Sequence, residues 1–225
     1  MKLVIISLFI LGLALAAKHK VTVYTESYCP GCVEFEAGSL AKFTNNPSKH
    51  QLAEVEVIVF GNAHEYKSES GYTYTCQHGE KECRGNLIES CVQKVLCGDI
   101  AERRLVCVAQ SMQSQWGDVE SKVYNCLEDE EKELVKNCVE TQSSEVMHDI
   151  ASRTKDHKYV PWIMLDGVHS DEIQEKLGDD MVDYLCKLND LVGKVQGCPS
   201  KSYKGKCHNE FYNSENGLNF LNWVN

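Results

Sequence analysis

Cys29-Pro30-Gly31-Cys32 follows the apolar run Val21-Thr22-Val23-Tyr24 and precedes a segment with amphipathic helical spacing, from Val33 to Ala41. This order predicts a strand, a tight turn and a helix. Cys29 then lies at the N-terminus of the helix, where unpaired N–H groups and the helix dipole favour a thiolate. Pro30 suits the first helical turn because it has no N–H to leave unpaired. Cys32 lies one turn further on, so the two cysteines are placed to alternate between dithiol and disulfide.

Residues 1–17 have the pattern of a secretory signal peptide: Lys2, an apolar run from Leu3 to Leu15, and small residues ending at Ala17. The run is too short to span a bilayer, which argues against an uncleaved anchor helix. Cleavage near Ala17 leaves about 208 residues, enough for one domain with an insertion. The net charge of −10 at pH 7 argues against nucleic acid or an anionic membrane as the main partner. We therefore expect a secretory-pathway protein without membrane insertion, either secreted or in endosomes and lysosomes.

Twelve cysteines are an unusual number for a chain of 225 residues. In an oxidising compartment most of them should be paired. With Cys29 and Cys32 set aside the remaining number is even, which predicts five structural disulfides but does not fix the pairing. These cysteines are Cys76, Cys83, Cys91, Cys97, Cys107, Cys126, Cys138, Cys186, Cys198 and Cys207.

Beyond the first helix, Val55–Phe60 is a nearly continuous apolar run, which predicts a second strand parallel to the first. Residues 63–86 are polar and rich in turn residues, and we expect a long ordered loop there. Helical spacing begins at Leu87 and recurs in four further segments up to Ile150. Because cysteines recur among these segments, we expect a helical insertion held by disulfides.

Strand signals return at Tyr159–Leu165, followed by the hairpin turn Asp166-Gly167 and a helix from Asp171 onward. A further helix is expected from Asp179 to Leu191. The predicted organisation is a signal peptide (1–17), a first thioredoxin-like part with the Cys-x-x-Cys (18–62), a cysteine-rich loop and helical insertion (63–157), a second thioredoxin-like part (158–197) and a cysteine-containing tail (198–225).

This order of elements resembles the thioredoxin architecture. The predicted fold class is therefore α/β, a thioredoxin-like fold with a disulfide-rich helical insertion. In that architecture a cis-proline faces the two thiols, and Pro161 in Val160-Pro161 matches its position. An X-Pro bond adopts the cis form far more readily than other peptide bonds. The alternative is an ordinary trans proline at the start of an edge strand.

Two metal interpretations compete with redox chemistry. Cys29 and Cys32 could form half of a zinc site, but the second Cys-x-x-Cys of a zinc ribbon is missing from the sequence. Cys76, His78, Cys83 and Cys91 could also ligate zinc, although disulfides are favoured in an oxidising compartment. His78 could instead be a general base, but no spacing rule places it near Cys29. We expect no metal site and no organic cofactor.

The run from Cys76 to Cys91 matches the pattern C-Q-H-G-x2-E-C-x2-N-x4-C, which resembles the signature of the gamma-interferon-inducible lysosomal thiol reductase (GILT) family. The matching residues are Cys76, Gln77, His78, Gly79, Glu82, Cys83, Asn86 and Cys91. The resemblance extends over nearly the whole mature chain. It implies reduction of disulfides in endocytosed proteins at acidic pH, with a role in antigen processing or innate immunity. We expect a structural role for the signature residues.

The functional hypothesis is a thiol-disulfide oxidoreductase in which Cys29 is the nucleophile, Cys32 the resolving thiol and Pro161 a contact for the substrate backbone. The partners are unfolded, disulfide-containing proteins and a small thiol as external reductant. A disulfide oxidase or isomerase, and a secreted cysteine-rich binding protein, remain alternatives. The resemblance implies delivery by mannose-phosphate glycans, but Asn46-Pro47-Ser48 is not a usable sequon because of its proline. Secretion or another sorting signal therefore stays open.

Overall fold

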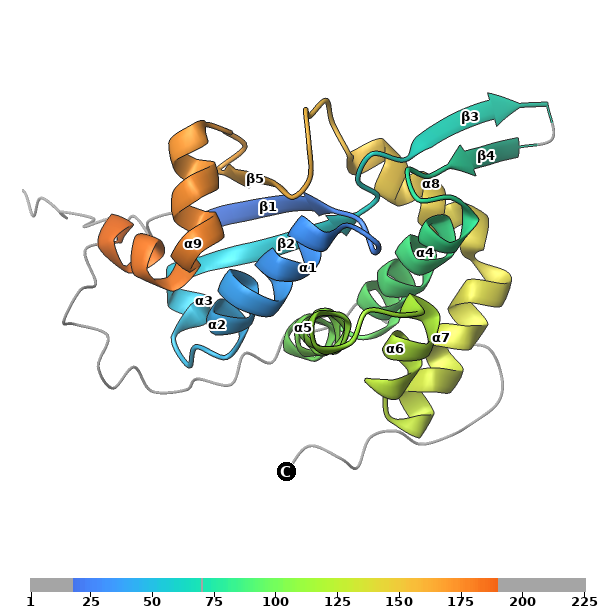
Figure 1. Cartoon of the computed structure of the whole chain (residues 1–225), viewed down its shortest axis with the longest axis horizontal. Helices are drawn as coiled ribbons and strands as arrows, with labels where there is room; N and C mark the ends of the chain where they lie inside the picture. Colours follow the sequence, from blue (N-terminus) through green and yellow to red (C-terminus); the bar gives the residue numbers. More distant parts are fainter. Residues whose placement is uncertain (1–17, 70, 190–225) are drawn as a thin grey trace, which may run out of the picture.

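The computed structural model describes residues 18–69 and 71–189 (Figure 1). The expected signal peptide and the tail with Cys198 and Cys207 lie outside these residues. At the centre is a three-stranded sheet in the order β2-β1-β5. Its strands are β1 (His19–Thr25), β2 (Ala53–Val59) and β5 (Trp162–Leu165). β1 pairs with β2 in parallel, as the sequence predicts, and with β5 in antiparallel.

One group of helices follows β1 and β5 closely in the chain. The segment after β1 consists of α1 (Pro30–Phe35), the π-helical turn η1 (Glu36–Leu40), α2 (Ala41–Thr44) and α3 (Lys49–Leu52). The long helix α9 (Asp171–Leu188) packs against β5 and η1. Asp180 has non-helical backbone angles inside α9 (φ −153°, ψ 90°). This kink divides α9 close to the predicted boundary between two helices.

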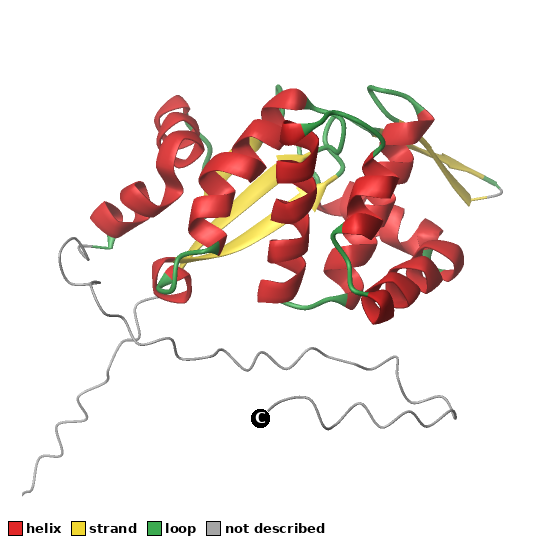
Figure 2. Ribbon diagram, turned by 60° about the horizontal axis from the view of Figure 1, so that its bottom comes forward, coloured by secondary structure: helices red, strands yellow, loops and turns green. Residues whose placement is uncertain are grey.

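Five helices lie between β2 and β5 in the chain, in agreement with the predicted helical insertion (Figures 1 and 2). They are α4 (Glu80–Val95), α5 (Asp99–Ser114), α6 (Val119–Asn125), α7 (Asp129–Thr141) and α8 (Ser143–Arg153). Disulfides join Cys91 of α4 to Cys138 of α7, and Cys107 of α5 to Cys126 after α6. The α/β class and the disulfide-rich insertion are therefore confirmed.

The loop predicted for residues 63–86 is wrong in part. This segment forms an antiparallel hairpin of β3 (His64–Ser68) and β4 (Gly71–Thr75), and α4 already begins at Glu80. Figure 2 shows the hairpin projecting from the helical body. Its side chains are exposed or half-buried and none is aliphatic, although Tyr and Thr, which favour strands, alternate from Tyr72 to Thr75. The first turns of α4 escaped prediction because their apolar spacing begins only at Leu87.

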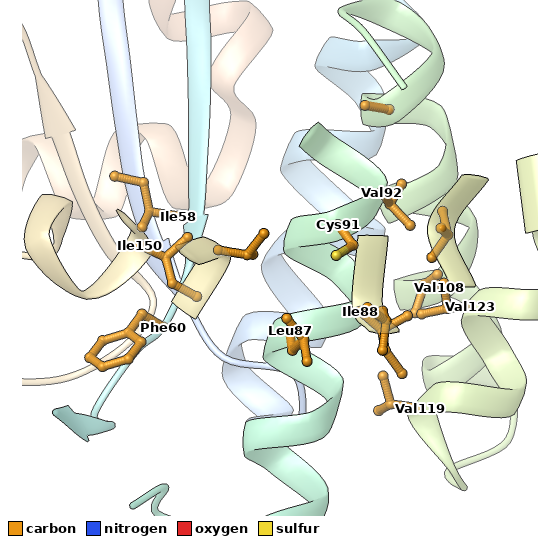
Figure 3. Close-up of a cluster of buried hydrophobic side chains, with 14 of the residues drawn as sticks. Ile58, Phe60, Leu87, Ile88, Cys91, Val92, Val108, Val119, Val123 and Ile150 are labelled. Atoms are coloured by element: carbon orange, nitrogen blue, oxygen red, sulfur yellow. The ribbon is translucent and has the colours of Figure 1, made fainter. Parts of the chain in front are cut away.

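The two faces of the sheet bury two separate cores, because side chains alternate along a strand. Val21, Val23 and Ile163 pack with α9 and the segment after β1. Tyr24, Ile58 and Trp162 point to the opposite face and join the core of the insertion. Figure 3 shows part of that second cluster, in which side chains from β2, α4, α6 and α8 come together. The insertion is thus packed onto the sheet rather than tethered beside it.

None of the helices in the described part of the chain combines the length and the apolar character that crossing a bilayer requires.

Candidate active site

Cys29 is the N-cap residue of α1, with an extended backbone, and Pro30 occupies the first helical turn. The Cys29 sulfur accepts a hydrogen bond from the Cys32 backbone N–H at 3.4 Å, an interaction that serves the unpaired N–H groups at a helix start. Cys29 is half-buried, whereas the Cys32 side chain is completely buried. The two thiols therefore differ sharply in their access to a substrate.

Pro161 faces these thiols from the start of β5, and the Val160–Pro161 peptide bond is cis, as predicted. The Cys29 sulfur lies 3.8 Å from the Val160 carbonyl oxygen. A Cβ built on Gly31 would lie 3.5 Å from Pro161 Cδ and 3.9 Å from the Cys29 sulfur, so the turn between the cysteines packs directly on the proline. The Cys-x-x-Cys turn and the Val160-Pro161 segment are therefore in direct contact.

The environment of the dithiol separates the two pKa values. The Cys32 thiol donates to the Cys29 sulfur, and the backbone N–H groups of Cys32 and Gly31 add further donors, which together lower the pKa of Cys29 to about 6 despite partial burial. Burial raises the pKa of Cys32 well above its ordinary value. Cys29 therefore has the properties of an attacking thiolate, and Cys32 has those of a thiol that stays protonated.

The signature residues connect the start of α4 to the loop that precedes Cys29. The Asn86 side chain accepts from the Ser27 backbone N–H at 2.9 Å and from the Ser27 hydroxyl at 2.6 Å. Gln77 accepts from the Asn62 side chain at 2.7 Å. Gly79 has φ +81° as the N-cap of α4, a conformation that favours glycine. The Asn86 contacts fix the loop between β1 and α1, and the Gln77 contact joins the start of α4 to the segment that follows β2.

The signature cysteines do not form the alternative zinc site. Cys76 is bonded to Cys83 at the start of α4, whereas Cys91 is bonded to Cys138 inside the insertion. The three signature cysteines therefore belong to two separate disulfides, one at the start of α4 and one inside the insertion. Cys97 is also disulfide-bonded. The predicted total of five disulfides stays a prediction, because Cys198 and Cys207 lie outside the described ranges.

His78 lies in a cluster with two glutamates rather than in open solvent. Its Nδ1 is hydrogen-bonded to the Glu82 carboxylate and lies 3.7 Å from Glu26 Oε1. The ligand-type atoms of the three side chains lie within 4.8 Å of one another, a spacing that a metal ion could use. These atoms are already engaged in hydrogen bonds with each other and with backbone N–H groups. We therefore describe the group as a hydrogen-bonded cluster.

Comparison with known proteins agrees with this geometry. A family model described as gamma interferon inducible lysosomal thiol reductase (GILT) matches residues 20–142, more than half of the chain. The chain belongs to the GILT family. A Carassius auratus protein named gamma-interferon-inducible lysosomal thiol reductase is 35% identical over 185 residues, which cover 77% of this chain and 69% of that protein. A Mus musculus protein of the same name is 27% identical, over 80% of this chain and 72% of its own length.

In this GILT-family protein, several residues that hold the site in place were missed by sequence reasoning. A Cβ on Gly85 would lie 2.4 Å from the Ser27 hydroxyl oxygen, so a glycine is needed where α4 meets the loop. Gln174 of α9 donates to the Pro161 carbonyl oxygen at 3.1 Å and accepts from the Ile163 backbone N–H at 3.0 Å, which fixes the proline. No local pattern marks these residues, because their partners are distant in the chain.

The GILT-family site also contains buried carboxyl groups that no sequence pattern indicated. Burial raises the pKa of Glu36 to about 8, with the charge of Cys29 adding to the effect. Burial and the charge of Glu36 raise the pKa of Glu89 well above its usual range. Burial likewise raises the pKa of Glu26 to about 7. These three carboxyl groups are therefore protonated in the folded protein over an acidic range where they would ionise in the unfolded chain.

These raised pKa values predict a GILT-family protein that is more stable in acid than at mildly alkaline pH. A raised folded-state pKa contributes stability that is complete below about pH 4.5 and is lost as the pH rises through about 7 to 8. We expect Glu36→Gln, a neutral isostere, to raise the melting temperature at pH 8 by about 5 °C and to change it little at pH 5.

The matched control for this stability prediction is Glu34→Gln, since Glu34 lies two residues away on α1 and is exposed. Melting curves from pH 5 to pH 8 provide the measurement. If both variants show the same fall in melting temperature as the unchanged protein, burial of the Glu36 carboxyl is not its source.

Proposed function

We propose that this protein is a thiol reductase that uses Cys29 and Cys32 to reduce disulfides in unfolded proteins in an acidic compartment of the secretory and endolysosomal system. The observation that carries this proposal is the pairing of an accessible thiol of low pKa with a buried thiol of high pKa, opposite Pro161. The names of the relatives support the reductase activity and the lysosomal setting.

The proposed reaction has two exchange steps. The Cys29 thiolate attacks one sulfur of a substrate disulfide, a mixed disulfide forms, and the other substrate sulfur leaves and takes up a proton. Cys32 then loses its proton and attacks the Cys29 sulfur, which releases the second substrate thiol. Substrate gains two electrons and two protons, and the protein is left with a Cys29–Cys32 disulfide. Two equivalents of a small thiol restore the dithiol and are themselves oxidised to a disulfide.

The lowered pKa of Cys29 suits work in acid. At pH 5 a thiol of pKa about 6 is roughly 10% ionised, whereas a thiol of pKa about 9 is roughly 0.01% ionised. The ionised fraction therefore differs by about a thousandfold. Since only the thiolate attacks a disulfide, this difference supports a reductase that works below neutral pH.

The oxidase or isomerase alternative keeps one observation in its favour. A low thiol pKa stabilises the reduced dithiol, and a stable reduced form makes a disulfide more oxidising. The reduction potential of the Cys29–Cys32 couple separates the alternatives. A value close to that of thioredoxin, about −270 mV, supports a reductase, and a value near −120 mV supports an oxidase.

The test of the proposed function is reduction of a denatured, disulfide-bonded protein by the purified mature chain, with a small thiol in excess, at pH 4.5 and at pH 7. Activity that is higher at pH 4.5, relative to the small thiol alone, is the expected result. Activity confined to pH 7 would support isomerase chemistry or an extracellular role. Inactivity at both pH values would contradict an enzymatic role and leave the cysteine-rich binding protein as the explanation.

A further inference from the structure

The cluster of Glu26, His78 and Glu82 places three ionisable groups beside the dithiol, and the proposed reaction does not use them. Glu26 lies in the loop before Cys29, and its carbonyl oxygen accepts from the Cys29 backbone N–H at 3.3 Å. His78 and Glu82 come from the start of α4. The side chains of Glu26 and Glu82 are 1% and 0% exposed, whereas His78 is 34% exposed. A partly exposed imidazole therefore links two buried carboxyl groups to solvent.

The two carboxyl groups have unequal surroundings. Glu82 accepts from the backbone N–H groups of Gln77 at 3.1 Å and His78 at 3.0 Å, in addition to its bond with the His78 ring. Glu26 accepts from the Asn62 backbone N–H at 2.8 Å. Burial raises the pKa of this carboxyl group to about 7.

Gly61 leaves the space that the Glu26 side chain occupies. A Cβ on Gly61 would lie 2.3 Å from Glu26 Oε2 and 2.6 Å from Glu26 Cβ, so the whole side chain is pressed against the backbone that follows β2. Gly61 has φ +58°, which also favours glycine. The carboxyl group is therefore held beside His78 by packing as well as by its hydrogen bond.

The ionisable groups that interact with the dithiol include Glu26 from the loop before Cys29, His78 from the start of α4 and Glu36 from η1. The pKa of Cys29 is lowered mainly by the Cys32 side chain, and His78 adds to that effect. The pKa of Cys32 is raised mainly by burial, and Glu36 adds to that effect. Lys81 of α4 places its Nζ 4.6 Å from the centre of the Tyr28 ring. Tyr28 is the residue immediately before Cys29 in the chain.

We propose that Glu26, His78 and Glu82 form a pH-dependent charge cluster that favours the Cys29 thiolate in acid and opposes it as the pH rises. This inference rests on the proposed function and adds a means of regulation at the same site. In acid the Glu26 carboxyl group is neutral, and Glu82 and the His78 ring hold their hydrogen bond beside it. As the pH rises through about 7, Glu26 becomes negative close to a sulfur that is itself becoming negative. Glu26 and His78 are positioning residues, since neither touches the reacting sulfur.

A measurable consequence is the shape of the Cys29 titration. A single independent thiol ionises along a one-proton curve. Here the loss of the Glu26 proton makes the ionisation of Cys29 less favourable, so the curve should be broader than a one-proton curve. A purely structural cluster would leave the shape unchanged.

The test is the rate at which iodoacetamide alkylates Cys29 in the reduced full-length mature protein between pH 4 and pH 9, with the modified cysteine identified by mass spectrometry. His78→Gln should slow alkylation at pH 5 by about two- to fivefold, because the interaction of His78 that helps to lower the pKa of Cys29 is lost. Glu26→Gln should speed alkylation at pH 6 by a similar factor and give a steeper curve, because a permanently neutral group replaces one that becomes negative. A change in the exposure of Cys29 that is common to both variants would shift both rates in the same direction.

The matched control is His148→Gln. His148 of α8 forms a pair of the same kind with Glu65 of β3, with 2.9 Å between Nδ1 and Oε1. This variant should leave the alkylation profile unchanged. Far-ultraviolet circular dichroism and the melting temperature establish that each variant is folded.

An unchanged profile in both folded cluster variants, or shifts of the same sign, would overturn the proposed charge cluster. Because alkylation requires no substrate disulfide, it is independent of reductase activity. A protein that fails to reduce disulfides but shows the opposite shifts would retain the charge cluster and lose the proposed function. A protein that reduces disulfides without these shifts would retain the function and lose the cluster.

Discussion

Cys29→Ser is expected to abolish disulfide reduction, with a loss of at least about a thousandfold, while the protein stays folded. A serine hydroxyl does not ionise in the working pH range, so the attacking anion is lost. The fold should tolerate the change, because serine is a favoured N-cap residue and its oxygen can accept from the Cys32 backbone N–H in place of the sulfur. The measurement is the reduction assay at pH 4.5 described above.

The companion variant Cys32→Ser should fail at the second exchange step instead of the first. Cys29 can still attack a substrate disulfide, but no thiol is placed to release it, so a mixed disulfide should accumulate.

Non-reducing electrophoresis and mass spectrometry would identify the adduct and the cysteine that carries it. A Cys29→Ser variant that retains more than a tenth of the activity would contradict the assignment of the nucleophile. An adduct on a cysteine other than Cys29 in the Cys32→Ser variant would contradict it as well.

The parts of this site that the sequence predicted are those with local causes. The turn at Cys29-Pro30-Gly31-Cys32 forms a helix start because proline and an N-cap acceptor satisfy the requirements of that position. The pairing of β1 with β2 follows from two apolar runs joined by a crossover helix. Pro161 was placed by resemblance to a known architecture, since its sequence neighbours do not distinguish cis from trans.

The parts that were missed depend on contacts between distant segments. No spacing rule relates His78 to Glu26, because the packing of α4 against the loop before Cys29 brings them together. The buried carboxyl groups of Glu36 and Glu89 contradict the usual expectation for charged residues, so helical spacing alone would assign them to solvent. The hairpin of β3 and β4 is mostly exposed and has no aliphatic residue, so the alternation of Tyr and Thr in β4 was its only sequence signal among the residues described there.

The disulfide between Cys91 and Cys138 is expected to stabilise the protein more than the disulfide between Cys76 and Cys83. It joins α4 to α7 across a sequence separation of 47 residues, and both cysteines are completely buried. Closing a loop of that length in the unfolded chain corresponds to about 4 kcal/mol. We therefore expect the double variant Cys91→Ala, Cys138→Ala to lose about 4 kcal/mol in free energy of unfolding, measured by urea denaturation at pH 5.

The comparison variant is Cys76→Ala, Cys83→Ala, whose disulfide spans a separation of only seven residues. The same relation gives about 2.5 kcal/mol for that shorter loop. Because Cys76–Cys83 lies beside Gln77 and His78, its removal should also alter the pH profile of Cys29 alkylation, whereas removal of Cys91–Cys138 should not while the protein is folded. Stability losses in the reverse order would show that the chain-entropy argument fails here. A shifted alkylation profile in the folded Cys91 and Cys138 variant would show that the insertion core, and not only the start of α4, sets the environment of the dithiol.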